Sequence, residues 1–170
     1  MKFRSILCPL FLLSALLVGC SPTDTSSPEE TVPYIYQDQL GRSYTVPETR
    51  DAVVEVSVPT LLDAWRENVA AAEEQYVSSS AALLTEGYIQ SICKVPQKAD
   101  YYIVLAAQPD APPLSPNSLR IYFRSEAAID SLLCVKAGDY VTLLAKATGT
   151  TPLYGHPALD AVRILMPDAA

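Results

Sequence analysis

From residue 82 onward, apolar and polar residues alternate in five short segments, with the period of strands that bury one face. The segments are rich in Val, Ile, Leu and Tyr, which favour strands, and turn-forming Pro, Gly, Asn and Asp separate them. The expected strands are residues 83–94, 101–107, 119–124, 140–147 and 158–166. One β-rich domain is therefore predicted for this part of the chain.

Between the third and fourth strands the period changes to that of a short helix. Ser125 is the expected N-cap, and Ile129, Leu132 and Leu133 are expected to face inward. An Ala-Gly-Asp turn at 137–139 then leads into the fourth strand. Five strands with a helix after the third is the order of an OB-fold. We predict a mainly β fold, a five-stranded OB-fold barrel.

A longer amphipathic helix is expected before the barrel. Thr60 and Asp63 fit a capping-box-like start. Trp65 lies in the apolar stripe, so packing is its expected role rather than ligand stacking. The stripe consists of Leu61, Trp65, Val69, Ala72 and Tyr76. The opposite face, with Arg66, Glu67, Glu73 and Glu74, is expected to be a solvated surface.

Residues 33–58 form a smaller β-rich extension. Two short apolar segments, 34–36 and 43–46, flank Gly41 and suggest a hairpin. Residues 53–58 alternate briefly and stop at Pro59. The domain of residues 59–170 then contains the amphipathic helix and the barrel.

The first 19 residues have the features of a signal peptide. Lys2 and Arg4 precede an apolar run that is shorter than the about 20 residues of a membrane span. The run ends in Leu17-Val18-Gly19-Cys20, which resembles a bacterial lipobox, where the cysteine receives a diacylglycerol before cleavage. Cys20 is the expected lipidation site, and its acyl chains would hold the protein at the membrane. A plain secretory signal with a chance cysteine is the alternative.

Residues 20–32 are polar and broken by proline, so a flexible lipidated tether is expected. Ser21 follows the lipobox cysteine where an aspartate would suggest retention in the inner membrane. The expected location is therefore the bacterial envelope, lipid-anchored in the outer membrane and facing the periplasm.

Two cysteines, Cys93 and Cys134, remain once the signal and the lipidation site are set aside. An exported protein with one remaining pair is expected to form a disulfide, worth about 4 kcal/mol in the chain-entropy model. Two buried free thiols are the alternative. The chain has no Cys-x-x-Cys motif, which argues against redox catalysis and a cysteine-rich zinc site.

Composition and charge indicate a single globular domain and argue against a nucleic-acid-binding protein. The 170 residues are 49% hydrophobic and 18% charged, as in a single globular domain. The net charge is −7, and removal of Lys2 and Arg4 with the signal leaves 10 basic against 19 acidic residues, or −9. A nucleic-acid binder usually carries a basic stripe, so nucleic acid is not an expected partner.

The part of the chain from Leu61 to Met166 resembles the tRNA-anti-like OB-fold family, whose bacterial members are often lipoproteins with a helix before the barrel. The matching residues are Leu62, Asn68, Ala72, Tyr76, Gly87, Tyr88, Ile89, Tyr122, Phe123, Leu133, Lys136, Ala137, Gly138, Asp139 and Val141. The resemblance implies the barrel and the lipid anchor. It implies no RNA-binding role.

No catalytic or metal-binding motif is present in the sequence. Gly-x-Gly-x-x-Gly, Gly-x-Ser-x-Gly and His-Glu-x-x-His patterns do not occur. The one histidine, His156, lies between Gly155 and Pro157 and is expected to be a polar loop residue. We expect no enzyme, no metal and no cofactor; a hydrolase built around His156 is the rival hypothesis.

The third strand suggests a binding surface. Arg120, Tyr122 and Arg124 alternate with apolar residues, so they share one face, and Tyr102 of the second strand could join them. Such a face could bind an acidic peptide, a glycan or a nucleic acid by charge and stacking. Alternatively, arginine and tyrosine only keep a strand edge soluble.

The function predicted from these features is that of a non-catalytic envelope lipoprotein with an OB-type binding or interaction module. Its partners would be the membrane, through the lipid, and an envelope protein or a glycan. The alternative is an oligosaccharide- or nucleic-acid-binding lipoprotein.

Overall fold

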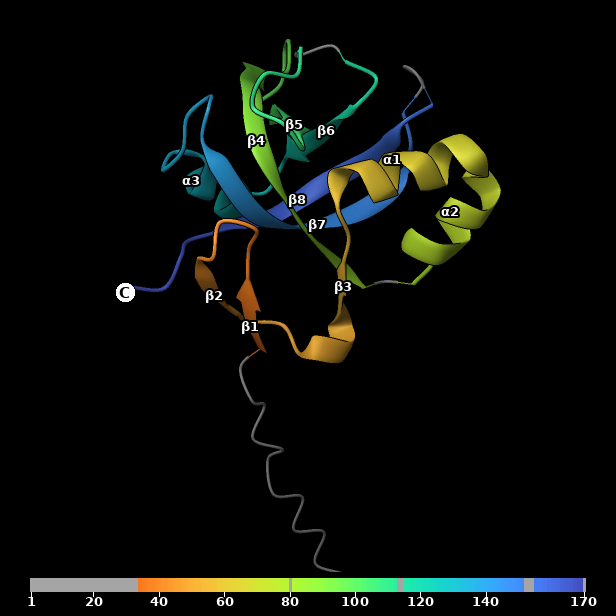
Figure 1. The fold of residues 1–170 in the computed structure, drawn as a ribbon. Coiled ribbons are helices and arrows are strands. Elements are labelled where there is room, and N and C mark those ends of the chain that lie inside the picture. Colours follow the sequence, from red (N-terminus) through yellow and green to blue (C-terminus); the bar gives the residue numbers. More distant parts are fainter. Residues whose placement is uncertain (1–33, 80, 113–114, 152–154, 170) are drawn as a thin grey trace, which may run out of the picture. The chain divides into compact units, whose positions relative to one another are not determined.

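The computed structural model describes residues 34–79, 81–112, 115–151 and 155–169. Five strands close into a barrel, each near the place predicted from the alternation of polar and apolar residues (Figure 1). They are β4 (Ala82–Lys94), β5 (Tyr101–Ala106), β6 (Ser118–Phe123), β7 (Tyr140–Thr150) and β8 (Pro157–Leu165). The predicted signal peptide, Cys20 and the tether lie outside the described residues.

The barrel closes because β4 reaches two partners. Its first half pairs with β7 and its second half with β5, and the order continues through β6 and β8 back to β7. β6 and β8 run parallel, with Ile121 opposite Leu159, and the other neighbours are antiparallel. This is the strand order of an OB-fold, so the predicted fold class is confirmed.

Alternation along the strands places apolar side chains inside the barrel. Leu119, Ile121 and Phe123 of β6 are fully buried, as are Ile103 and Leu105 of β5. β4 and β5 approach each other closely at one glycine. A Cβ at Gly87 would lie 2.6 Å from the carbonyl oxygen of Ala106, so the chain admits no side chain there without a backbone shift.

The helix expected before the barrel is two helices, α1 (Val58–Glu67) and α2 (Val69–Tyr76). Asn68 separates them in an extended conformation, with φ −159° and ψ 97°. Its Oδ1 accepts a hydrogen bond from the amide of Ala71 at 3.1 Å and so caps α2. The prediction of one continuous helix is wrong because this side chain satisfies the backbone of the second helix.

Two further expectations about these helices are wrong. Val69, predicted in the apolar stripe, is 40% exposed. The cap of α1 is Ser57 rather than Thr60, because Ser57 Oγ accepts from the Thr60 amide at 3.2 Å. The brief alternation over residues 53–58 contains a three-residue strand, β3 (Val53–Glu55), which pairs in parallel with the start of β4.

Trp65 packs in the core, as predicted, and also fixes the two helices to the barrel. It is 1% exposed and stacks on Tyr76 of α2 at 5.8 Å between ring centroids. Its Nε1 donates to Thr150 Oγ1 at 2.9 Å, and Thr150 in turn donates to Glu73 at 2.7 Å. Glu73 is therefore engaged and partly buried instead of lying on a solvated surface.

The short helix α3 (Glu126–Leu132) follows β6. Ser125 Oγ accepts from the Ala128 amide at 3.2 Å, which confirms the predicted N-cap. Leu132 is buried and Ile129 packs against the core. Leu133 is 80% exposed, contrary to prediction, because the helix has already ended and the chain turns away.

The N-terminal extension forms the predicted hairpin, β1 (Tyr34–Gln37) and β2 (Ser43–Val46), followed by a 3-10 turn (Arg50–Ala52) and β3. Tyr44 and Val46 are buried in a second apolar cluster that includes Leu84, Leu144 and Leu165 of the barrel. In Figure 1 the hairpin lies beside β7, and it covers the outer wall of the barrel, because Leu84 and Leu144 alternate with the core residues Leu83 and Leu143. The extension is thus part of the folded domain.

Candidate ligand-binding face

Register between neighbouring strands brings the four predicted binding residues together on the outside of the barrel. Arg120, Tyr122 and Arg124 occupy alternate positions, and the residues between them point into the core. Tyr102 of β5 lies directly opposite Tyr122. We call the surface formed by Tyr102, Arg120, Tyr122 and Arg124 the Tyr–Arg face.

The aromatic rings of this face are each paired with a guanidinium group. The ring centroids of Tyr102 and Tyr122 are 5.8 Å apart. Arg120 Cζ lies 4.7 Å from the Tyr102 centroid, and Arg124 Cζ lies 4.8 Å from that of Tyr122. Both distances are within the range of cation–π attraction, so the four side chains hold one another in place.

Two aspartates that sequence analysis missed complete the face. Arg124 Nη1 lies 2.8 Å from Asp160 Oδ2 on β8, and its Nε lies 3.8 Å from Asp100 Oδ2 in the loop between β4 and β5. Asp160 Oδ1 is covered and has no hydrogen-bond partner among the described residues. Two arginines and two aspartates give the face no net charge.

Cys93 borders the face, in the strand position opposite Tyr102. Its hydrogen bond to Tyr102, together with burial, raises the pKa of the Tyr102 hydroxyl. Cys93 and Cys134 are both free thiols, so the predicted disulfide is not formed in the structure. Cys134 is exposed and lines a small pocket with Arg42 and Tyr44, whereas Cys93 borders the Tyr–Arg face. The number of cysteines in the sequence does not indicate that the two lie in different places.

His156 lies in the loop between β7 and β8 and has a hydrogen bond with the backbone of Ser118, at the start of β6. Burial lowers the pKa of its imidazole, and the positive charges of Arg66 and Arg120 lower it further. The hydrogen bond with the Ser118 backbone raises the pKa, but by less than these effects lower it. The lowered pKa favours the neutral imidazole. Among the described residues, no group of three or more His, Cys, Asp or Glu side chains is placed to hold a metal ion.

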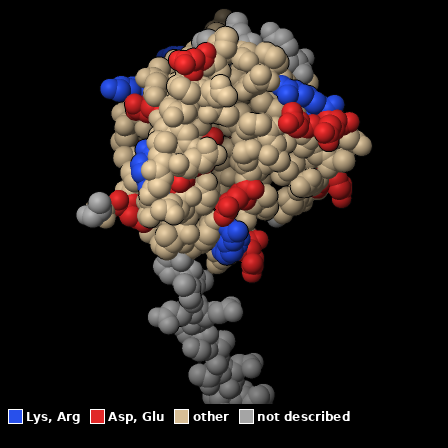
Figure 2. Space-filling model, viewed as in Figure 1, with Lys and Arg blue, Asp and Glu red and all other residues tan. Residues whose placement is uncertain are grey.

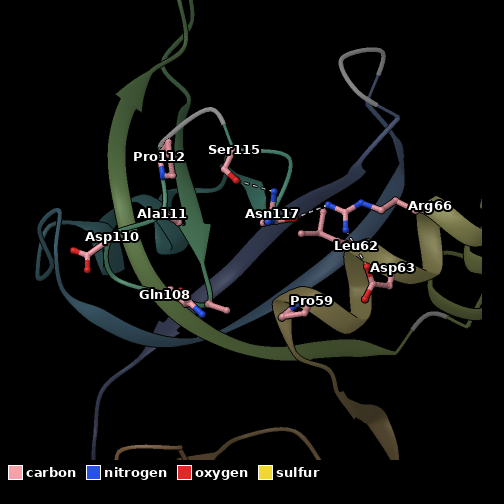
Figure 3. Close-up of a pocket in the computed structure, with 11 residues that line it drawn as sticks. Pro59, Leu62, Asp63, Arg66, Gln108, Asp110, Ala111, Pro112, Ser115 and Asn117 are labelled. Atoms are coloured by element: carbon pink, nitrogen blue, oxygen red, sulfur yellow. Dashed lines mark hydrogen bonds and ion pairs between the residues drawn. The ribbon is translucent and has the colours of Figure 1, made fainter.

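A pocket of about 510 Å³ lies next to the barrel, between α1 and the loop that joins β5 to β6 (Figure 3). Pro59, Leu62 and Arg66 line it from the helix, and Gln108, Asp110 and Asn117 line it from the barrel side. We call it the helix pocket. Sequence analysis placed Arg66 on a solvated surface and gave no signal for the pocket, because its two walls are about 50 residues apart.

Charged side chains do not gather into a basic surface on the view in Figure 2. Acidic and basic groups lie scattered there, several of them side by side, around a broad uncharged area. In the part of the chain that the structure describes, no helix is both long and apolar enough to cross a membrane.

The sequence matches no protein-family model and no curated protein. Among solved structures, a "putative nucleic acid-binding lipoprotein" from Klebsiella pneumoniae is 17% identical with a TM-score of 0.49, over 68% of this chain and 99% of that one. The Stn1-Ten1 complex of S. pombe gives 15% identity and a TM-score of 0.36, over 51% of this chain and 59% of that one. A "putative aspartyl-tRNA synthetase" from Leishmania major is 12% identical with a TM-score of 0.45. This match covers 74% of this chain but only 23% of the other chain.

Proposed function

We propose that this protein is a non-catalytic, lipid-anchored binding module of the bacterial envelope, and that it binds neutral oligosaccharides on the Tyr–Arg face. The observation that carries the proposal is the pair of tyrosine rings at 5.8 Å, held by Arg120 and Arg124, of which Arg124 is itself paired with Asp100 and Asp160. Tyrosine rings offer flat apolar surface, and guanidinium and carboxylate groups offer hydrogen-bond donors and acceptors. Sugar rings present CH groups and hydroxyls that match both.

The charge balance favours a neutral glycan over a nucleic acid. A protein that binds a phosphate backbone replaces condensed counterions with its own cations. Arg124 is already paired with two carboxylates, and the chain as a whole has a net charge of −7. A polyanion would therefore meet repulsion without a compensating basic track.

Asp160 gives a specific reason for a ligand with hydroxyl groups. A covered acceptor without a hydrogen bond costs about 1–3 kcal/mol. Asp160 Oδ1 is such an atom, next to the exposed side chain of Arg124. A ligand hydroxyl that displaced the atoms covering Asp160 Oδ1 would donate to it and remove this cost, whereas a phosphate diester, which only accepts, would not.

Envelope attachment is the second part of the proposal. The basic start, the apolar run and the lipobox-like sequence before Cys20 support lipidation at that residue, and Ser21 supports the outer membrane. The lipid would keep the binding face near envelope glycans. The absence of a recognisable catalytic motif in the sequence supports a binding role.

A glycan microarray with the mature protein tests the proposal. We expect binding to neutral oligosaccharides that weakens at least tenfold in Arg120→Ala and in Tyr122→Ala, a loss of about 1.4 kcal/mol or more. Arg163→Ala is the matched control, because Arg163 is an exposed arginine on β8 outside the face. Binding to no arrayed glycan would overturn the proposal, and so would tight, salt-sensitive binding of poly(dT) that depends on Arg120.

A further inference from the structure

Arg66 fixes the two walls of the helix pocket relative to each other. Its Nη1 lies 2.9 Å from Asp63 on the same helix. Its Nη2 lies 3.0 Å from Asn117 Oδ1 and also donates to the carbonyl of Pro116, both just before β6 (Figure 3). One guanidinium thus joins α1 to the barrel, and the pocket is formed before any ligand enters.

The lining of the pocket suits a sugar that carries an acetamido group. Its volume of about 510 Å³ is in the range of small-molecule sites. Pro59, Ala111 and Pro112 give apolar surface for ring CH groups and a methyl group. The side chains of Gln108 and Asp110 have no hydrogen-bond or ion-pair partner among the described residues, so an amide and a carboxylate are available.

Asn117 adds a third polar group. Its Oδ1 is engaged by Arg66, which leaves the Nδ2 donors available to a carbonyl oxygen. An acetamido group has one such oxygen and one N–H, and the side chains of Asn117, Gln108 and Asp110 can bind both. A phosphate or carboxylate ligand would instead face the two carboxylates Asp63 and Asp110 with only Arg66 to offset them.

One lining residue of the pocket, Asn117, lies next to the strand that carries the Tyr–Arg face. Asn117 directly precedes β6, and Arg120 follows three residues later, about 10 Å along an extended strand. Arg124 is seven residues from Asn117, about 24 Å away. His156 has a hydrogen bond with the backbone of Ser118, the first residue of β6 after Asn117.

We infer that the helix pocket is an end subsite, which binds the terminal N-acetylated sugar of the same oligosaccharide that lies along the Tyr–Arg face. The inference rests on the proposed function for the identity of the chain. It assigns α1, which is not part of the barrel, a role in ligand selection.

The test uses the mature protein with N-acetylglucosamine and its β-1,4-linked oligomers of two to six units. In NMR titrations the monosaccharide should produce saturable shifts of the side-chain NH₂ signals of Gln108 and Asn117. Asp110→Leu should abolish these shifts, while Gln75→Ala, at an exposed amide on α2, should leave them unchanged. No shift at either amide, or equal shifts in Asp110→Leu, would overturn the inference.

Oligomer length separates this inference from the proposed function. Asp110→Leu should weaken the hexamer about tenfold, the size of one or two lost hydrogen bonds, and Arg120→Ala should also weaken it. If Arg120→Ala weakens the hexamer but Asp110→Leu does not, the end subsite is wrong and the proposed face stands. If only the pocket variant has an effect, the proposed face is wrong, and with it the inference that one chain spans both sites.

Discussion

The carboxylate of Asp38 accepts a hydrogen bond from Arg42 Nε at 2.7 Å, and this ion pair closes the turn of the N-terminal hairpin. Asp38 is 5% exposed and also accepts from the Tyr44 hydroxyl at 2.8 Å. Arg42 extends to the barrel, where its Nη2 donates to the carbonyl of Tyr140 at 3.1 Å. The hairpin therefore contributes a buried polar cluster to the domain, beyond its apolar contacts.

Asp38→Ala should destabilise the folded domain by about 3 kcal/mol. The substitution removes four hydrogen-bond acceptor contacts, from the amides of Leu40 and Arg42, the Arg42 guanidinium and the Tyr44 hydroxyl. It also leaves Arg42 without its carboxylate, and breaking such a pair is costly. Urea unfolding followed by circular dichroism measures the change. Asp51→Ala, in the exposed 3-10 turn, is the control and should change stability by less than about 0.5 kcal/mol.

The same cluster makes stability depend on pH in the acid range. Burial alone would raise the pKa of Asp38, but hydrogen bonds from Arg42 and Tyr44 outweigh burial and lower it. The unfolded chain, with an ordinary aspartate pKa of about 3.9, then binds more protons than the folded protein. Stability from this group is present above that value and is lost as pH falls through the lower folded pKa. We expect the free energy of unfolding to fall less between pH 6 and pH 2 in Asp38→Asn than in the wild type. Plots of this free energy against pH that run parallel for the two proteins would contradict the assignment.

Closure of the barrel can be tested at Gly87. A Cβ at this position would meet the Ala106 carbonyl oxygen at 2.6 Å, and backbone atoms cannot move away as a flexible side chain could. Gly87→Ala should therefore cost about 1–3 kcal/mol, although alanine is normally tolerated better than glycine in a strand. Thermal unfolding measures the effect, with Ser91→Ala in the same strand as the control. An unchanged melting temperature in Gly87→Ala would mean that β4 and β5 are further apart.

Features that repeat locally were predictable from the sequence. The alternation of residues 119–124 correctly separated Leu119, Ile121 and Phe123, which are buried, from the Tyr–Arg face. Ser125 was identified as a cap because its role depends on the amide three residues later. Both signals need only neighbouring residues and a known period, which a single sequence contains.

Contacts between distant residues were not predictable in the same way. Arg66 meets Asn117 across 51 positions, and Asp160 meets Arg124 across 36. Nothing in either local segment indicates the other. Asp38 and Arg42 are neighbours in sequence, but the burial that makes their pair important comes from the barrel. The helix pocket and the acidic side of the face depend on such contacts.

Lipidation at Cys20 is a prediction with a direct readout. In the wild type, mass spectrometry of detergent-extracted protein should show an N-terminal cysteine at residue 20 that carries a diacylglycerol. Cys20→Ala removes the acceptor thiol, so the signal should remain attached and the protein should keep residues 1–19. Cys8→Ala is the control, since that cysteine lies inside the signal. An unmodified mature N-terminus in the wild type would contradict lipidation.

The break between α1 and α2 gives the last prediction. Asn68 caps α2, and replacing a cap by alanine costs about 1 kcal/mol. Alanine is also the best helix former, so Asn68→Ala favours joining the two helices, which would pull Tyr76 from its stacking position on Trp65. We expect a loss of about 1–2 kcal/mol in urea unfolding, together with a changed Trp65 fluorescence spectrum. Asn68→Asp should retain most of the stability because its carboxylate can accept the same bond from Ala71. If Asn68→Ala and Asn68→Asp were equally stable, the cap would not hold the break, and the turn between the helices would have to be fixed by the packing of Trp65 and Tyr76 alone.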